Sequence, residues 1–116
     1  MEDRVETDFL FGFYGPLLTE RQRALLSLWC EEDLSLSEIA SREGITRQGV
    51  HDTVRSAVMR LHDLEDRLGL AARYWRLTAG LRMCLDEIRG IPGEAARRAE
   101  NKMEALLAWE EDDDGL

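Results

Sequence analysis

The segment from Ser35 to His51 has the pattern of a helix-turn-helix, and it constrains the fold more than any other part of the chain. Ser35 and Glu38 have the spacing of a capping box, in which a hydroxyl and a carboxylate each accept a hydrogen bond from a backbone N–H at a helix start. Gly44 is suited to end that helix in the left-handed conformation. Thr46 then caps a second helix. The segment therefore predicts two helices joined by a tight turn.

The exposed start of the second helix predicts a surface that contacts nucleic acid. When a helix-turn-helix docks on DNA, the first exposed side chains of its second helix face base edges, and arginine or glutamine can make two hydrogen bonds to a purine. We expect three side chains to face the bases, namely Arg47, Gln48 and His51. Three others are placed for phosphate contacts, namely Ser37, Thr46 and Arg55. The alternative interpretation is an ordinary helical hairpin buried in a helical domain.

The distribution of charge limits what kind of nucleic-acid binder this is. The formal net charge is −9, which argues against a protein that coats nucleic acid indiscriminately, because such binding requires a cationic face. Between residues 45 and 62, however, three arginines stand against one aspartate, which gives a local balance of +2. The expected reading helix is thus a locally basic element on an acidic protein. This suits site-restricted DNA contact or no DNA contact at all.

The rest of the chain predicts an all-α fold, because apolar residues recur at helical spacing and no sustained alternation marks a strand. The second helix is expected to continue to Gly69, with a heptad seam formed by Val50, Val54, Ala57, Leu61, Leu64 and Leu68. Two further helices follow, one before Gly90 and one that carries Ala95, Ala99, Met103, Leu106 and Trp109. We expect this hairpin to cover part of the seam and a second protomer to cover the rest, in a two-fold homodimer.

These elements divide the chain into three parts. Residues 1–70 are predicted to form the helix-turn-helix domain, residues 71–109 a C-terminal helical hairpin that packs on it, and residues 110–116 a disordered acidic tail. The chain start lacks the apolar core of a signal peptide, and no apolar run is long enough to span a membrane. We therefore expect a soluble protein of the cytoplasm with no membrane insertion.

The sequence does not predict an enzyme, a cofactor or a metal site. Cys30 and Cys84 lie far apart within apolar helical patterns, which is typical of small core residues. His62 and Glu65 share a helix face, but no other metal ligand stands at a suitable spacing, so a solvated face is expected. The three tryptophans, Trp29, Trp75 and Trp109, lie in apolar helical patterns, for which core packing is the default and base stacking the alternative.

Three segments together resemble the YlxM family of small bacterial helix-turn-helix proteins: residues 10–22 (LFGFYGPLLTERQ), 32–40 (EDLSLSEIA) and 45–50 (ITRQGV). The resemblance covers about the first seventy residues. It implies an all-α protein whose helix-turn-helix is similar to region 4 of sigma-70 factors, the region that reads promoters. It also implies a regulatory role in the signal recognition particle pathway. Gly49 departs from the pattern, which usually has alanine there, and so does His51.

Two functions follow as hypotheses. The first is a DNA-binding helix-turn-helix regulator, which the exposed pair of Arg47 and Gln48 favours. The second is an interaction module that does not bind DNA but binds the protein or the RNA of the signal recognition particle and modulates its GTPase. The acidic charge balance favours this second hypothesis. Fold class alone does not decide between them.

Overall fold

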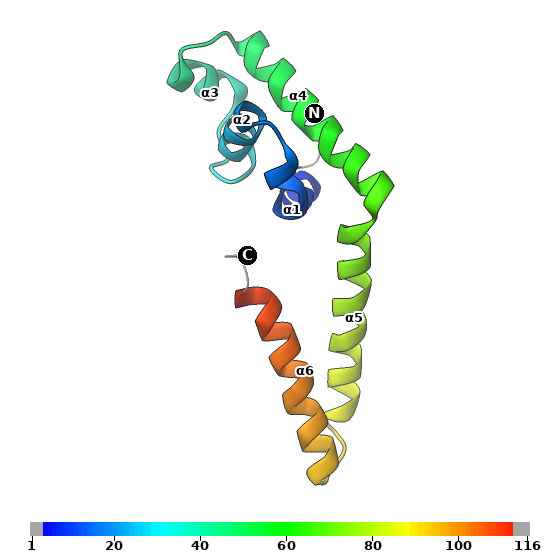
Figure 1. Ribbon diagram of the computed structural model, residues 1–116. Coiled ribbons are helices and arrows are strands. Elements are labelled where there is room, and N and C mark those ends of the chain that lie inside the picture. Colours follow the sequence, from blue (N-terminus) through cyan, green and yellow to red (C-terminus); the bar gives the residue numbers. More distant parts are fainter. Residues whose placement is uncertain (1–3, 113–116) are drawn as a thin grey trace. The chain divides into compact units, whose positions relative to one another are not determined.

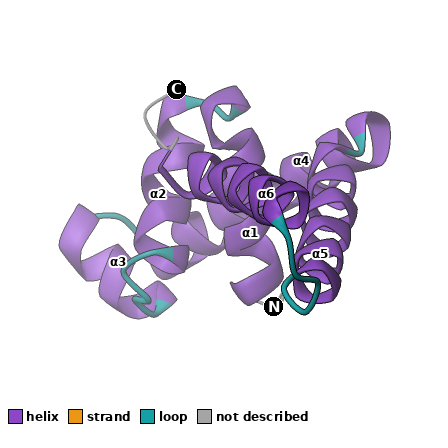
Figure 2. Ribbon diagram, turned by 90° about the horizontal axis from the view of Figure 1, so that it is seen from below, coloured by secondary structure: helices purple, strands orange, loops and turns teal. Residues whose placement is uncertain are grey.

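The protein is all helical over the residues that the computed structural model describes, which are residues 4–112 for the backbone and 4–108 for the side chains. Figures 1 and 2 show helices joined by loops, with no strand in this part of the chain. The predicted all-α class is confirmed. In order, the elements are α1 (Arg4–Tyr14), the short 3-10 helix η1 (Gly15–Leu17), α2 (Glu20–Cys30), α3 (Leu36–Glu43), α4 (Arg47–Leu68), α5 (Leu70–Ile88) and α6 (Glu94–Asp112).

The chain divides into two compact units, and the boundary falls between Ala71 and Ala72. The first unit contains α1 to α4, and the second contains nearly all of α5 together with α6. The sequence placed a boundary one residue earlier, after residue 70. That the hairpin packs on the helix-turn-helix domain stays a prediction.

The first unit is built around one apolar face of α4. Figure 1 shows α1, α2 and α3 gathered along α4, and their apolar side chains form one core with it. Val50, Val54, Ala57 and Leu61 are fully buried, and Leu64 is 7% exposed. They pack with residues from the other three helices, including Leu10, Tyr14, Leu25, Leu26, Trp29 and Ile39. This core anchors α4 while its opposite face remains in solvent.

The prediction of which elements bury the α4 seam was therefore wrong. We expected the C-terminal hairpin and a second protomer to bury it, but α1, α2 and α3 bury it as far as Leu64. The reason is that α1 lies against α4 in addition to the two helices that precede the turn. The last seam position, Leu68, is 53% exposed, since it lies beside the helix end at Gly69.

Several apolar residues of the second unit also differ from expectation. Trp29, in the first unit, is buried as predicted. In the second unit, however, Trp75 is 64% exposed, and Cys84 and Leu106 are exposed as well. The side chain of Trp109 lies outside the described residues. Residues 110–112 belong to α6, so the prediction of a disordered tail was wrong for them, and residues 113–116 lie outside the described part.

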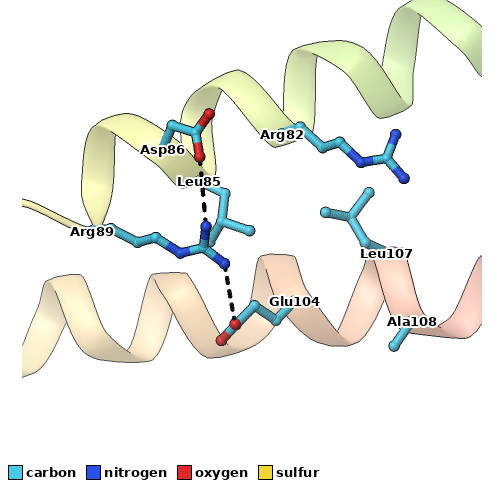
Figure 3. A pocket seen from close by; sticks show the side chains of 7 residues that line it. All are labelled: Arg82, Leu85, Asp86, Arg89, Glu104, Leu107 and Ala108. Carbon is cyan, nitrogen blue, oxygen red and sulfur yellow. Dashed lines mark hydrogen bonds and ion pairs between the residues drawn. The ribbon is translucent and has the colours of Figure 1, made fainter.

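Helices α5 and α6 form a loosely packed hairpin. Leu85 of α5 and Leu107 of α6 are both nearly buried between the two helices (Figure 3). The Arg89 guanidinium lies 3.4 Å from a Glu104 carboxylate oxygen and 3.8 Å from one of Glu100, both on α6. A groove of about 380 Å³ opens beside these contacts. The hairpin is thus held by a few contacts along one face of each helix.

A hydrogen-bonded cluster joins α1 to the junction of α4 and α5. The buried Tyr14 hydroxyl donates to Glu65 Oε1 at 2.6 Å and accepts from the backbone N–H of Leu70 at 3.1 Å. The same Glu65 oxygen accepts from the N–H of Ala71 at 3.0 Å. These acceptors satisfy N–H groups at the start of α5 that have no partner within the helix. Burial, followed by the hydrogen bond to Glu65, raises the pKa of Tyr14 above its ordinary value.

We expect Tyr14→Phe to lower the free energy of unfolding by about 1–3 kcal/mol, because it leaves buried polar groups without a partner. Because the pKa is raised in the folded state, the stability that protonated Tyr14 contributes depends on pH. This contribution is fully present below pH 10.0, the ordinary tyrosine value, and is lost as pH rises through the folded-state pKa. Denaturant unfolding of both proteins at a series of pH values measures this. Identical alkaline declines in the two proteins would show that the cluster does not couple Tyr14 to folding.

Candidate nucleic-acid interface

The helix-turn-helix has the geometry that its residues predict, from the start of α3 to the start of α4. Ser35 and Glu38 form both bonds of the capping box, with the Ser35 N–H donating to the Glu38 carboxylate at 2.8 Å. This hydrogen bonding lowers the pKa of Glu38. Gly44 is left-handed, with φ of +70°, and the next N–H, that of Ile45, donates to the carbonyl of Ala40 at 3.1 Å. The turn thus ends α3 and starts α4 with little irregular chain.

The start of α4 depends on Thr46 and Gly49. The Thr46 hydroxyl caps the helix by accepting from the N–H of Gly49 at 2.9 Å. A Cβ at position 49 would lie only 3.1 Å from that hydroxyl oxygen. Glycine therefore fits the cap closely, at a cost to helix propensity of about 1 kcal/mol relative to alanine. This departure from the family pattern has a local structural reason.

The α2–α3 loop, which leads into the motif, is held from α1. The Arg4 guanidinium donates to a carboxylate oxygen of Asp33 at 2.6 Å and to the carbonyl of Leu34 at 3.1 Å. It also lies over the ring of Trp29, 4.7 Å from the centroid. Asp33 has a positive φ of 56°, which is uncommon for a residue other than glycine. Arg4 therefore fixes this loop, and with it the start of α3.

The structure places the six predicted site residues on α3, on α4 and at the α4 cap. Ser37, Thr46, Arg47, Gln48 and Arg55 are exposed. The side chain of His51 is 34% exposed, and its Nδ1 atom is buried without a hydrogen-bond partner. Arg47, His51 and Arg55 follow one another at intervals of four residues, so they lie along one side of α4. Their roles at a nucleic acid stay predictions.

Asp52, the one aspartate counted against the arginines of residues 45–62, is a neighbour of this surface. Its carboxylate accepts a hydrogen bond from Gln48 Nε2 at 2.9 Å and lies 3.6 Å from His51 Nδ1. The Gln48 amide is therefore engaged within the helix. To contact a base it must exchange this exposed bond for a new one.

The arginines of the first unit fall into two groups. Arg4, Arg42, Arg60 and Arg67 each lie within 4 Å of a carboxylate oxygen. Over residues 4–108, the other four, Arg21, Arg23, Arg47 and Arg55, are exposed and have no ion-pair partner, and of these Arg47 and Arg55 lie on α4. A guanidinium without a carboxylate partner can bind a phosphate without first breaking a salt bridge.

Sequence reasoning missed a further cation, Arg21 of α2, which lies beside α4. A shallow groove of about 250 Å³ lies between the start of α2 and α4, lined by Thr19, Arg21, Gln22, Asp52, Thr53 and Ser56. Gln22 also donates from Nε2 to the Ser56 hydroxyl at 3.1 Å, so the two helices are joined at this point. Arg21 is exposed and lies on the first turn of α2. The available sequence signal was its position two residues after Thr19, the residue that caps the start of α2.

The described residues offer no other candidate site of a familiar chemistry. Among them, no group of three or more histidine, cysteine or acidic side chains could hold a metal ion. Burial raises the pKa of the Cys30 thiol to about 12, so this cysteine stays protonated at neutral pH. None of the helices within the described range is long and apolar enough to cross a membrane.

Comparison with known proteins matches residues 1–88 to the family UPF0122, described as "Putative helix-turn-helix protein, YlxM / p13 like". The chain belongs to this family. A UPF0122 protein of Symbiobacterium thermophilum is 41% identical over 99 residues, which is 85% of this chain and 92% of the relative. One of Desulforamulus reducens is 35% identical over 107 residues, or 92% of each chain. The likeness therefore extends beyond the helix-turn-helix unit into the α5–α6 hairpin of this chain.

We expect Thr46→Ala to destabilise the first unit by about 1 kcal/mol, because it removes the acceptor that caps α4. Thr46→Ser is the matched control, since serine keeps the hydroxyl oxygen in place. Thermal or urea unfolding measures both variants. If alanine and serine at position 46 gave equal stabilities, the cap would contribute nothing to the folded state.

Proposed function

We propose that this protein is a helix-turn-helix regulator that binds duplex DNA through the start of α4. The observation that carries the proposal is the pair of exposed arginines, Arg47 and Arg55, that lack ion-pair partners on the solvent side of α4. Membership of a helix-turn-helix family supports the same function.

In the proposed complex the first turns of α4 enter the major groove. Arg47 makes two hydrogen bonds to a guanine, which is the commonest base-specific contact. Gln48 leaves Asp52 and reads an adenine, and His51 lies against a neighbouring base edge. Ser37, Thr46 and Arg55 contact phosphates, and Arg21 adds a phosphate contact from α2. These phosphate contacts fix the position of α4 in the groove.

Asp52 makes the proposed interface selective for particular DNA sequences. A carboxylate among these side chains repels phosphate, and it can accept a hydrogen bond only from a base that offers an amino group, such as cytosine. Its bond to Gln48 also holds that amide away from the bases in the free protein. Binding to unselected DNA is therefore weak, and a matching sequence compensates for separating Gln48 from Asp52.

A second candidate function has its own supporting observation, the net charge of −9. An acidic protein is repelled by any polyanion, DNA and RNA alike, so this charge favours a protein partner. In this alternative the same helices bind the protein or the RNA of the signal recognition particle and modulate its GTPase, the role that the family resemblance implies. Partner capture from lysate treated with DNase, with RNase or with neither separates the candidates. Loss after DNase alone supports the first, and retention after DNase supports the second.

Arg47→Ala is expected to weaken binding to a DNA sequence selected from a random pool by about 1–3 kcal/mol, since it removes a two-bond base contact. Arg67→Ala is the matched control, because Arg67 lies at the other end of α4 and pairs with Asp63. Fluorescence anisotropy titrations of both variants measure the effect. Equal affinities for the two variants would remove Arg47 from the reading surface.

Asp52→Ala is expected to raise affinity for unselected duplex DNA several-fold, because one unit charge near a phosphate contributes about 1 kcal/mol at 4 Å in water. Wild type is expected to show a small salt slope, with about two displaced ions from the phosphate contacts of Arg21 and Arg55. Titrations at several salt concentrations give both values. A slope near ten ions would contradict the model of few phosphate contacts.

A further inference from the structure

Helix α5 carries a second heptad pattern that its contact with α6, in the same unit, leaves partly exposed. Apolar residues recur along it at alternating intervals of four and three, which is the spacing of a coiled-coil seam. The α5 seam consists of Leu70, Tyr74, Leu77, Leu81, Cys84 and Ile88. Leu77 is 59% exposed, Leu70 is 49% exposed, and Cys84 is exposed as well, whereas Tyr74, Leu81 and Ile88 are half-buried. By contrast, α4 buries the same type of seam as far as Leu64.

The α5 seam is not the face that α5 turns towards α6. Figure 3 shows Arg82, Leu85 and Arg89 of α5 on the side of the groove shared with α6. At 100° per residue, the centre of the seam lies about a quarter turn away from these side chains. Contact with α6 therefore leaves much of the seam in water.

We propose that the α5 seam binds the α5 helix of a second copy of this chain, with the two helices antiparallel. A heptad stripe matches another helix with the same repeat, and a second copy supplies it. In an antiparallel pair centred on Ala79, each seam residue faces the residue equally far on the other side of the centre. Leu77 then faces Leu81, Tyr74 faces Cys84, and Leu70 faces Ile88. Each seam residue of one copy therefore packs against a seam residue of the other copy.

The charges beside the α5 seam favour this orientation. Arg73 and Glu87 are exposed residues on the same flank of the seam, and over residues 4–108 neither has an ion-pair partner. In the antiparallel register, Arg73 of each copy lies two residues, or about 3 Å along the axis, from the position opposite Glu87 of the other, within reach of two equivalent ion pairs. In a parallel pair the two positions are 14 residues, or about 21 Å, apart along the axis and cannot meet.

Gly80 lies midway between Arg73 and Glu87 on the same flank. A Cβ there would touch nothing within 4 Å, so packing within the chain does not require glycine. Glycine inside a helix costs about 1 kcal/mol relative to alanine. In the antiparallel pair each Gly80 lies one residue from the centre, so the two glycines are about 3 Å apart along the axis on the same flank, where the absence of side chains lets the helices approach closely. The proposed dimer thus gives this glycine a role.

The proposal is independent of DNA binding. If both hold, the dimer joins two helix-turn-helix units around a two-fold axis, and such an arrangement recognises paired half-sites.

The first test is the oligomeric state of the full chain by sedimentation equilibrium. We expect wild type to dimerise and Leu77→Glu to be monomeric at about 100 μM, since a buried charge in the seam has no partner. Met83→Glu is the matched control, because Met83 is 66% exposed on the same helix but lies outside the seam. We expect this variant to dimerise as wild type does. A monomeric wild type, or a Leu77→Glu variant that dimerises normally, would overturn the proposal.

The second test addresses orientation. Arg73→Glu and Glu87→Arg are each expected to raise the dimer Kd about fivefold, because each places like charges opposite one another twice. The double variant restores both pairs and the wild-type Kd. Oxidation provides a second readout in a Cys30→Ser background: antiparallel copies keep their Cys84 residues about 15 Å apart along the axis, beyond disulfide reach. A Cys84 cross-link between copies, or a double variant as weak as the singles, would overturn the antiparallel register.

Discussion

The burial of one face of α4 is the contact on which the rest of the first unit depends. Val50, Val54 and Leu61 are fully buried, and α1, α2 and α3 all pack against them. Because these side chains recur at helical spacing, their burial also fixes the rotation of α4 about its own axis. That rotation leaves Arg47, Gln48 and Arg55 in solvent. The core therefore positions the candidate interface without contributing atoms to it.

Polar contacts then fix the ends of the helices around this core. The Thr46 cap and the left-handed Gly44 determine where α4 begins, and the Tyr14–Glu65 pair satisfies the first N–H groups of α5. Each such bond contributes little to net stability, but leaving its buried partners unsatisfied costs more. These bonds therefore specify helix boundaries more than they add stability. At the candidate interface, this means that the first turn of α4 is fixed before any ligand binds.

The two heptad seams of the chain have different outcomes for a physical reason. The α4 seam is followed on both sides by apolar faces from three neighbouring helices, so it closes within the chain. The α5 seam has one neighbouring helix in its own unit, and α6 contacts a different face. A similar spacing of apolar residues thus produces a core in one helix and an exposed stripe in the other. The charge pattern around Gly80 makes the second stripe suited to self-association.

The sequence by itself determined the all-helical class, the Ser35–Glu38 capping box, the glycine turn and the exposure of Arg47 and Gln48, because spacing and capping chemistry act over a few residues. Only the tertiary structure decided what covers each apolar face, since periodicity shows that a face must be covered but not which element covers it. It therefore corrected the cover of the α4 seam and the expected burial of Trp75 and Cys84. It also showed Asp52 engaging Gln48 and Arg21 lining the groove beside α4, because such contacts depend on how side chains and separate helices meet in space.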